Sequence, residues 1–291
     1  MRQGKMLAPF LLAVSLICVS CYRPVVLVHG MFGSAPSEFG KTFENWIKSE
    51  HNGTIIYAIR MFEKLCSLRP MWYQVGKINE QVREIMRGHP EGVHFVCYSQ
   101  GGLLCRGIVS SMNHNVHNFI SLSSPQAGQY GIPRKWDRYM PANCIKTNIY
   151  KFFYTHFVQN HLSVANYWND PHHQTLYRNY SVFLSHLDGS TPSPNMSEYK
   201  RNFLKLHRLV LIGGPDDDVV TPWQSSHFSF YDENENVVEM KKQKFFQDDS
   251  FGLQTLYNKK RVHIHTFPGV VHKKWYANRT VFNSAILPYL T

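Results

Sequence analysis

Short apolar runs recur along this chain, and stretches with helical spacing lie between them. After Pro70, apolar residues repeat at Val75, Ile78, Val82 and Ile85, which is the spacing of one face of an amphipathic helix. Further helices are expected around 43–49 and from 103 to about 112. The runs of strand length fall at 25–28, 54–59, 93–97, 119–122, 209–212 and 262–266. This alternation predicts an α/β fold, with a mostly parallel sheet covered by helices on both faces.

The third of these runs ends in a motif that carries chemistry. The sequence from Val93 to Gly102 is a strand, a tight turn at Ser99 and the start of a helix, and it matches in part the Gly-x-Ser-x-Gly nucleophile elbow. Cys97 stands at the first glycine position. In such an elbow a strained turn exposes the serine Oγ, and the N-terminus of the next helix stabilises negative charge. The alternative is an ordinary turn, so the interpretation depends on partners elsewhere in the chain.

Candidate partners follow other strands. The first strand runs into the loop His29-Gly30-Met31, the strand at 209–212 delivers three consecutive aspartates at 216–218, and the last strand precedes His272. Serine, acid and histidine in this order, each after a strand, are typical of α/β-hydrolases. These coincidences favour a catalytic site over a simple turn.

The chemistry of acyl transfer assigns a role to each residue. Ser99 is expected to attack the carbonyl while His272 takes its proton, and an aspartate fixes the imidazole tautomer. Asp217 fits this role best, because it is followed by one residue and then by two apolar residues, as the acid commonly is in hydrolases of this fold. Asp216 is suited to bracing the turn, and Asp218 is expected to face solvent. The backbone N–H groups of Gln100 and Met31 are the expected oxyanion donors.

The alternation of strands and helices is lost between Pro125 and about Arg201, where aromatic residues become frequent. An insertion at about 126–205 is expected to form a cap whose apolar surface suits an acyl chain. In the alternative interpretation, most of the rings only pack the insertion onto the sheet. The aromatic residues concerned include Trp136, Tyr139, Tyr150, Phe152, Phe153, Tyr154, Phe157, Tyr167 and Trp168.

The N-terminus predicts entry into the secretory pathway. Arg2 and Lys5 precede an apolar segment from Met6 to Val19, which is too short for an ordinary membrane span, and we assign residues 1–21 to a signal peptide. Residues 22–291 are then expected to form a single α/β-hydrolase domain. Four N-glycosylation sequons, which also occur by chance, lie at Asn52, Asn179, Asn195 and Asn278.

The cysteines suggest one disulfide. Cys97 ends the strand of the elbow and Cys105 lies about one turn into the next helix, so a bridge between them is sterically reasonable. Two buried free thiols are the alternative. The pairing of Cys21, Cys66 and Cys144 cannot be read from the sequence.

Charge and histidine spacing limit the partners. The formal net charge of +11 includes basic clusters at 241–244, 259–261 and 273–274, which read as solvated surface or as peripheral contact with anionic lipid. No nucleic-acid-binding module accompanies this charge, so nucleic acid is not expected as a partner. The histidine pairs 172–173 and 263/265 lack further ligands at metal-binding spacing, so no metal is expected.

Several blocks of this sequence resemble the palmitoyl-protein thioesterases. Cys97–Gly102, His29–Met31 and Ile120–Gln126 carry the resemblance to the family, and the blocks 166–173, 213–217 and 221–226 are similar to its second, lysosomal branch. The segment 150–165 lacks a second cysteine pair that this branch carries.

The resemblance implies a function. It indicates a lysosomal serine hydrolase that cleaves fatty acyl thioesters without a cofactor. Secretion is the alternative location, and no stable membrane span is expected from the short leader. A lipase or carboxylic esterase of the same fold and a non-catalytic lipid-binding protein are the alternatives. The sequence leaves open the acyl chain length, whether the thiol belongs to CoA or to a protein, and the oligomeric state.

Overall fold

The computed structural model describes residues 22–35, 38–133 and 142–291. The predicted signal peptide at 1–21, with Cys21, lies outside the described residues. Trp136 and Tyr139 of the insertion also lie outside them.

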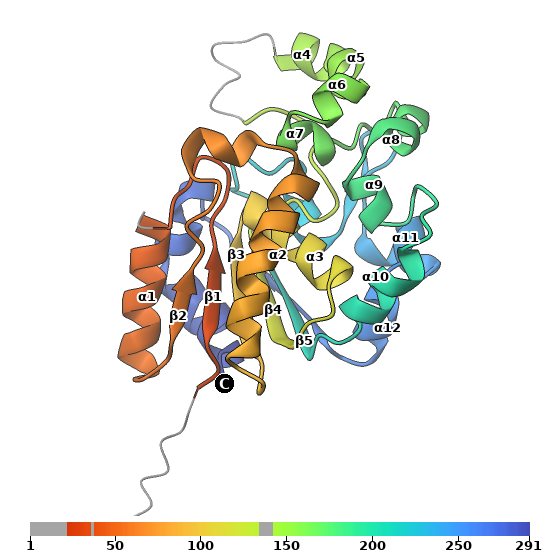
Figure 1. Cartoon of the computed structure of the whole chain (residues 1–291). Helices are drawn as coiled ribbons and strands as arrows, with labels where there is room; N and C mark the ends of the chain where they lie inside the picture. The colour runs from red at the N-terminus through yellow and green to blue at the C-terminus, as the bar shows by residue number, and fades with distance from the viewer. Residues whose placement is uncertain (1–21, 36–37, 134–141) are drawn as a thin grey trace, which may run out of the picture.

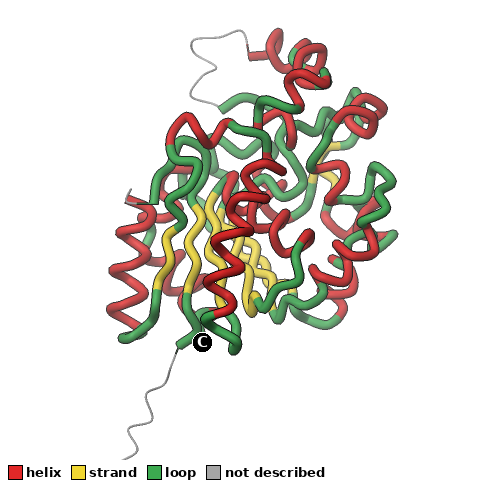
Figure 2. The backbone as a smooth tube through the Cα atoms, viewed as in Figure 1, coloured by secondary structure: helices red, strands yellow, loops and turns green. Residues whose placement is uncertain are grey.

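A parallel sheet of six strands forms the centre of the molecule, in the order β2-β1-β3-β4-β5-β8 (Figures 1 and 2). The strands that we predicted are present, although the second is shorter than 54–59. The carbonyl of Ile55 still accepts a hydrogen bond from Val25 N, so the backbone stays extended beyond the strand. The strands are β1 (Val25–Val28), β2 (Ile56–Ala58), β3 (Val93–Tyr98), β4 (Val116–Leu122), β5 (Arg208–Gly213) and β8 (Val262–Thr266).

Helices cover both faces of the sheet, and side chains alternate between two hydrophobic cores. Val26 and Val28 of β1 point to the core under α2 and α3, whereas Val25 and Leu27 point to the core under α1 and the C-terminal helices. Strands buried on both faces are typical of parallel sheets, which explains the continuous apolar runs in the sequence.

The predicted amphipathic helix is α2. Its buried residues include Val75, Ile78, Val82 and Ile85, so the apolar face read from the sequence is the face that packs on the sheet. The helices of the main fold are α1 (Glu38–Glu50), η1 (Lys64–Leu68), α2 (Met71–Arg87), α3 (Gln100–Ser111), η3 (Trp223–His227), η4 (Met240–Lys242), α11 (Lys244–Gln247), α12 (Leu253–Asn258), η5 (His272–Ala277), α13 (Arg279–Val281), η6 (Phe282–Ile286) and η7 (Leu287–Tyr289). A small antiparallel hairpin pairs β6 (Phe230–Tyr231) with β7 (Val237–Val238).

The insertion is a chain of short helices. It contains α4 (Ala142–Asn148), α5 (Tyr150–Phe153), α6 (His156–Gln159), α7 (Ser163–Asn166), α8 (Gln174–Tyr180), α9 (Leu184–Leu187) and α10 (Met196–Phe203). Figure 1 shows α4 to α7 above the carboxyl ends of the strands, at the top of the view. Tyr154, Tyr167 and Trp168 are buried in the main core, whereas the side chains of Phe152 and Phe157 are 57% and 70% exposed.

Candidate active site

Ser99 lies in the turn between β3 and α3, at the carboxyl edge of the sheet. Its φ is 55° and its ψ is −129°, a conformation that L residues rarely adopt, and it directly precedes the first residue of α3. This is the backbone geometry of a nucleophile elbow, in which the strain is held by the surrounding structure.

Two glycines allow other backbone segments to approach this turn. A Cβ atom at Gly101 would lie 2.5 Å from the carbonyl oxygens of both Val28 and His29, and a Cβ atom at Gly30 would lie 2.7 Å from Cβ of Ser99. Real Cβ atoms do not approach other atoms so closely. The loop after β1 can therefore lie against the elbow only because both positions are glycine.

The imidazole of His272 lies next to Ser99. His272 begins η5, shortly after β8, and its Nε2 is 3.0 Å from Oγ of Ser99. Its ring is buried, and the ring of Tyr98 lies 5.1 Å away, centroid to centroid. The hydroxyl of Tyr98 donates a hydrogen bond of 2.9 Å to the carbonyl of His272, so contacts on two sides fix the position of the imidazole.

Asp217 lies behind the imidazole, in the loop after β5. Its Oδ2 and Oδ1 are 2.9 and 3.1 Å from Nδ1 of His272. The N–H groups of Val219 and Val220 donate to Oδ1 at 2.9 Å, and Nε1 of Trp275 donates to Oδ2 at 2.8 Å. Burial would raise the pKa of the Asp217 carboxyl, but the hydrogen bonds and the charge of His272 outweigh it and lower this pKa below its ordinary value.

The neighbouring aspartates have different partners. Asp216 is exposed, and its Oδ2 accepts a hydrogen bond of 2.6 Å from the backbone N–H of Gly269, so it braces the loop before His272. We expected Asp218 to face solvent, and this was wrong in part. Asp218 is half-buried, and its Oδ1 accepts a hydrogen bond of 2.9 Å from the backbone N–H of His272.

Two residues of this site were missed by the sequence analysis. Ser123 follows β4, has a φ of 45°, and its hydroxyl donates a hydrogen bond to Oδ2 of Asp217. Trp275 is the second donor to the same oxygen. Ser123 stands directly after a strand, as Ser99 and the aspartate loop do, and that position at the carboxyl edge was the available signal.

The segments that carry Met31 and Gln100 both lie beside Ser99. Gln100 is the first residue of α3, so its N–H belongs to the unpaired donors of the helix N-terminus. Met31 follows Gly30, the residue packed against Ser99. The side chain of His29 anchors this loop, with Nδ1 2.9 Å from the carbonyl oxygen of Gly30 and Nε2 3.1 Å from that of Met61.

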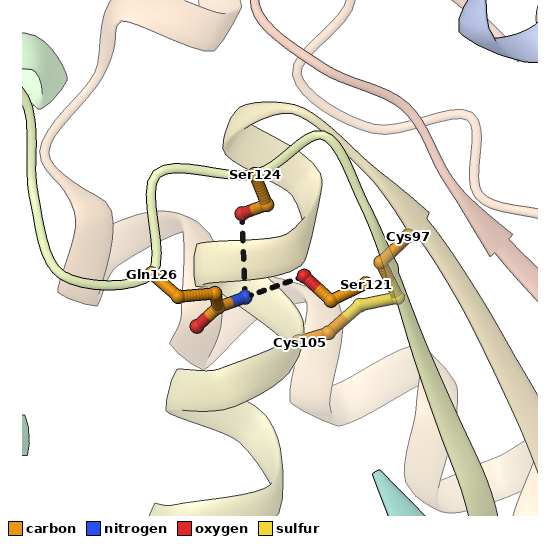
Figure 3. The surroundings of a disulfide bond; sticks show 5 residues. All are labelled: Cys97, Cys105, Ser121, Ser124 and Gln126. Atoms are coloured by element: carbon orange, nitrogen blue, oxygen red, sulfur yellow. Dashed lines mark hydrogen bonds between the residues drawn. A yellow bond between two sulfur atoms is a disulfide. The ribbon is translucent and has the colours of Figure 1, made fainter. Parts of the chain in front are cut away.

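The structure contains the disulfide between Cys97 and Cys105. Its S–S distance is 2.03 Å, and it joins the end of β3 to α3 directly under the elbow (Figure 3). Figure 3 also shows Gln126, whose Nε2 donates to the hydroxyls of Ser121 and Ser124 beside the bridge. The bridge ties the strand before the elbow to the helix after it.

Outside this disulfide, the structure describes the side chain of one further cysteine. Cys66 is exposed and carries a free thiol. Cys21 and the side chain of Cys144 lie outside the part of the chain that the structure describes.

The four sequons differ in their surroundings. Asn52, Asn179 and Asn195 are exposed, as an acceptor for glycan must be. Asn278 is half-buried, and its side-chain oxygen accepts a hydrogen bond of 3.1 Å from Val281 N at the start of α13. Glycosylation at each position stays a prediction.

His172, His173 and His265 have hydrogen-bond partners, whereas Nε2 of His263 is buried without one. His172 Nε2 lies 3.0 Å from Oε1 of Glu235, and His173 Nδ1 lies 3.1 Å from Oδ2 of Asp170. Among the described residues, no group of three or more His, Cys, Asp or Glu side chains is placed to hold a metal ion. Over the same residues, no helix is both long and apolar enough to cross a membrane.

The parallel sheet, the elbow and the order of the site residues give this chain the α/β-hydrolase fold that we predicted. Residues 24–272 match the family model described as palmitoyl protein thioesterase, so the chain belongs to that family. The predicted family is confirmed, and the chain is an acyl-thioester hydrolase.

The chain is similar to several known proteins. The chain is 46% identical over 271 residues to "Lysosomal thioesterase PPT2" of Mus musculus, covering 93% of this chain and 88% of that protein. It is 46% identical over 293 residues to "Lysosomal thioesterase PPT2-B" of Xenopus laevis, covering 100% of both. Among solved structures, the mature Bacillus licheniformis lipase BlEst2 superposes with a TM-score of 0.48 at 16% identity, covering 94% of this chain and 93% of that one.

Proposed function

We propose that this chain hydrolyses fatty acyl thioesters through an acyl-enzyme formed on Ser99, with His272 as general base and Asp217 as the third member of the triad. The observation that carries the proposal is the continuous hydrogen-bond path from Oγ of Ser99 through the imidazole to a buried carboxylate. A path of this kind activates a hydroxyl that is otherwise a weak nucleophile.

The reaction follows from this geometry in two steps. Oγ of Ser99 attacks the acyl carbonyl while its proton moves to Nε2 of His272, and collapse of the tetrahedral intermediate breaks the C–S bond. The thiol leaves with that proton, or leaves as a thiolate that is protonated in solvent while His272 releases its proton to water, since an ordinary thiol has a pKa of about 8.5. Water, deprotonated by His272, then attacks the ester on Ser99, and the fatty acid leaves as Oγ recovers a proton.

We assign the oxyanion hole to the backbone N–H groups of Met31 and Gln100. Both residues lie in segments that pack beside Ser99, and Gln100 begins α3, whose N-terminal dipole favours negative charge. Preorganised donors of this type contribute about 3 kcal/mol each to stabilisation of the transition state.

The insertion is proposed to bind the acyl chain, and residues 22–291 are proposed to form one domain. The position of α4 to α7 above the carboxyl ends of the strands, where Ser99 lies, supports this role. Phe152 and Phe157 are exposed on α5 and α6 and are available to contact an apolar ligand, whereas Phe153 is buried and packs within the insertion.

We propose the lysosome as the site of action, reached through the secretory pathway, with secretion as the alternative. The apolar leader at 1–21 and the lysosomal names of the mouse and frog relatives support this location. The basic clusters at 241–244, 259–261 and 273–274 would favour peripheral contact with anionic lipid that contains the substrate.

The test compares a palmitoyl thioester with the matching oxygen ester, using the mature protein. A thioesterase hydrolyses the thioester faster, a carboxylic esterase or lipase shows the reverse preference, and a lipid-binding protein turns over neither. Ser99→Ala is the matched control, because it removes Oγ with little change in packing. Equal turnover by wild type and Ser99→Ala would contradict the proposal.

A further inference from the structure

Ser67 is a buried serine that contacts both segments proposed to form the oxyanion hole. It lies in η1 and its side chain is fully buried. The hydroxyl accepts a hydrogen bond of 2.9 Å from the backbone N–H of Phe32, the residue after Met31, and donates one of 2.5 Å to the carbonyl of Lys64 within its own turn. One end of Ser67 is thereby bonded to the loop that carries the first proposed donor.

The carbonyl oxygen of Ser67 contacts the second segment. It accepts a hydrogen bond of 2.7 Å from Nε2 of Gln100 and one of 2.9 Å from Nε2 of Gln74 in α2. The side chain of Gln100 is 2% exposed, so water does not compete for this bond. Through the hydroxyl and the carbonyl of one residue, Ser67, the loop after β1 and the first residue of α3 are joined by two direct hydrogen bonds.

The same cluster reaches the insertion. Oε1 of Gln100 accepts hydrogen bonds from the hydroxyls of Ser163 in α7, at 2.9 Å, and Tyr167, at 3.2 Å. Oγ of Ser163 also lies 3.1 Å from the carbonyl oxygen of Ser67, and its single proton goes to one acceptor at a time. The position of α7 above the site is thus linked to Gln100.

We infer that Ser67 is a positioning residue for the oxyanion hole: it sets the separation of the Met31 and Gln100 N–H groups and connects both to α7 of the insertion. This inference rests on the proposed function. A change of about a few tenths of an ångström in the distance between the two N–H groups weakens their hydrogen bonds to the oxyanion of the tetrahedral intermediate. Binding of the substrate is not affected, because its planar carbonyl does not yet carry the negative charge. Loss of Ser67 should consequently lower kcat and leave KM nearly unchanged.

The experiment uses the variant Ser67→Ala and two inhibitors. A palmitoyl trifluoromethyl ketone forms a tetrahedral adduct with Ser99 and requires the oxyanion hole, whereas a palmitoyl thioether of the same length binds without reacting. We expect kcat for a palmitoyl thioester and affinity for the ketone to fall together by about tenfold or more, with thioether affinity and KM within about twofold of wild type.

Matched variants separate positioning from general packing. Ser111→Ala removes a half-buried hydroxyl that donates to the carbonyl of Gly107 near the C-terminal end of α3, and it should leave both affinities unchanged. Gln100→Met keeps the backbone N–H but removes the side-chain contact to Ser67, and it should reproduce the loss of kcat and ketone affinity. If Ser67→Ala does not unfold cooperatively, Gln100→Met tests in its place whether the contact with Ser67 positions the oxyanion hole.

The outcomes that overturn the inference are distinct from failure of the proposed function. Equal losses of ketone and thioether affinity, or unchanged kcat in folded Ser67→Ala, would show a purely structural role for Ser67 while wild type still turns over the thioester. If wild type neither turns over the thioester nor forms the ketone adduct, the proposed function itself is wrong and the inference falls with it.

Discussion

The hydroxyl of Ser123 donates a hydrogen bond to Oδ2 of Asp217, and its oxygen lies 3.1 Å from Nδ1 of His272. A hydroxyl has a single proton, and here the carboxylate receives it, because the imidazole Nδ1–H is itself a donor to Asp217. Together with the donors from Val219, Val220 and Trp275, Ser123 favours the charged form of this buried carboxyl. These donors hold the pKa of the Asp217 carboxyl below its ordinary value.

The first prediction concerns Ser123→Ala. Loss of this donor weakens the hydrogen-bond network that holds the Asp217 carboxylate in place behind His272, so turnover should fall. We expect kcat/KM to fall by about tenfold, which corresponds to about 1.4 kcal/mol. Ser121→Ala, a buried neighbour that bonds to Gln126 instead, is the control. Equal kcat/KM values for Ser123→Ala and Ser121→Ala would argue against this role.

The second prediction compares the three consecutive aspartates. Asp217→Asn should lower kcat by roughly four orders of magnitude, because the imidazole is then held in the wrong tautomer. Asp218→Asn keeps an oxygen that can accept from His272 N, and Asp216→Asn alters only the exposed brace to Gly269, so both should be nearly neutral. Steady-state kinetics on variants with cooperative melts provide the measurement. A larger loss at Asp216 or Asp218 would reassign the triad acid.

The third prediction concerns the disulfide under the elbow. Replacing both Cys97 and Cys105 by Ala should lower the free energy of unfolding by about 2.5 kcal/mol, as expected for closure of so short a loop. Cys66→Ala removes the exposed free thiol and should leave stability unchanged. Denaturant unfolding measures both, and equal stability of all three proteins would count against a bridge in the folded protein.

The fourth prediction concerns pH and a buried histidine. His94 of β3 is fully buried beside His117 and Arg23, and burial, with the charges of these neighbours, lowers its pKa to about 3. The unfolded chain, with an ordinary pKa near 6.5, binds this proton first, so His94 reduces stability progressively as the pH falls from about 6.5 towards 3.

The measurement is unfolding of wild type and His94→Gln at several pH values. The slope of the unfolding free energy against pH between 4 and 6 should be smaller in the variant, by up to about 1.4 kcal/mol per pH unit. Identical slopes would show that protonation of His94 is not coupled to folding.

The strands and the chemistry at their ends could be predicted because they leave local patterns. The strand at 209–212 and the apolar face of α2 were read correctly, since burial on a parallel sheet imposes continuous or periodic apolar residues. The elbow was recognisable because Ser99, Gly101 and Gly102 lie within four consecutive residues.

Contacts between distant segments could not be predicted. Trp275 and Ser67 reach the site through side chains whose orientation depends on the packed structure, and a lone serine or tryptophan has no distinctive spacing. The signal for Ser123 was its position directly after a strand, which does not show its partner. The role of Asp218 was misjudged for the same reason, since its partner is a backbone N–H 54 residues away. The insertion has no regular alternation of strands and helices, so the sequence indicated only that it is rich in aromatic residues.

The most direct test of the account is identification of the residue that carries the acyl group. The mature protein is mixed with a palmitoyl thioester, quenched in acid within the first turnover, and its peptides are mapped by mass spectrometry. The account predicts palmitate on Ser99 in wild type and none in Ser99→Ala. Palmitate on another residue, or unchanged turnover by Ser99→Ala, would contradict it.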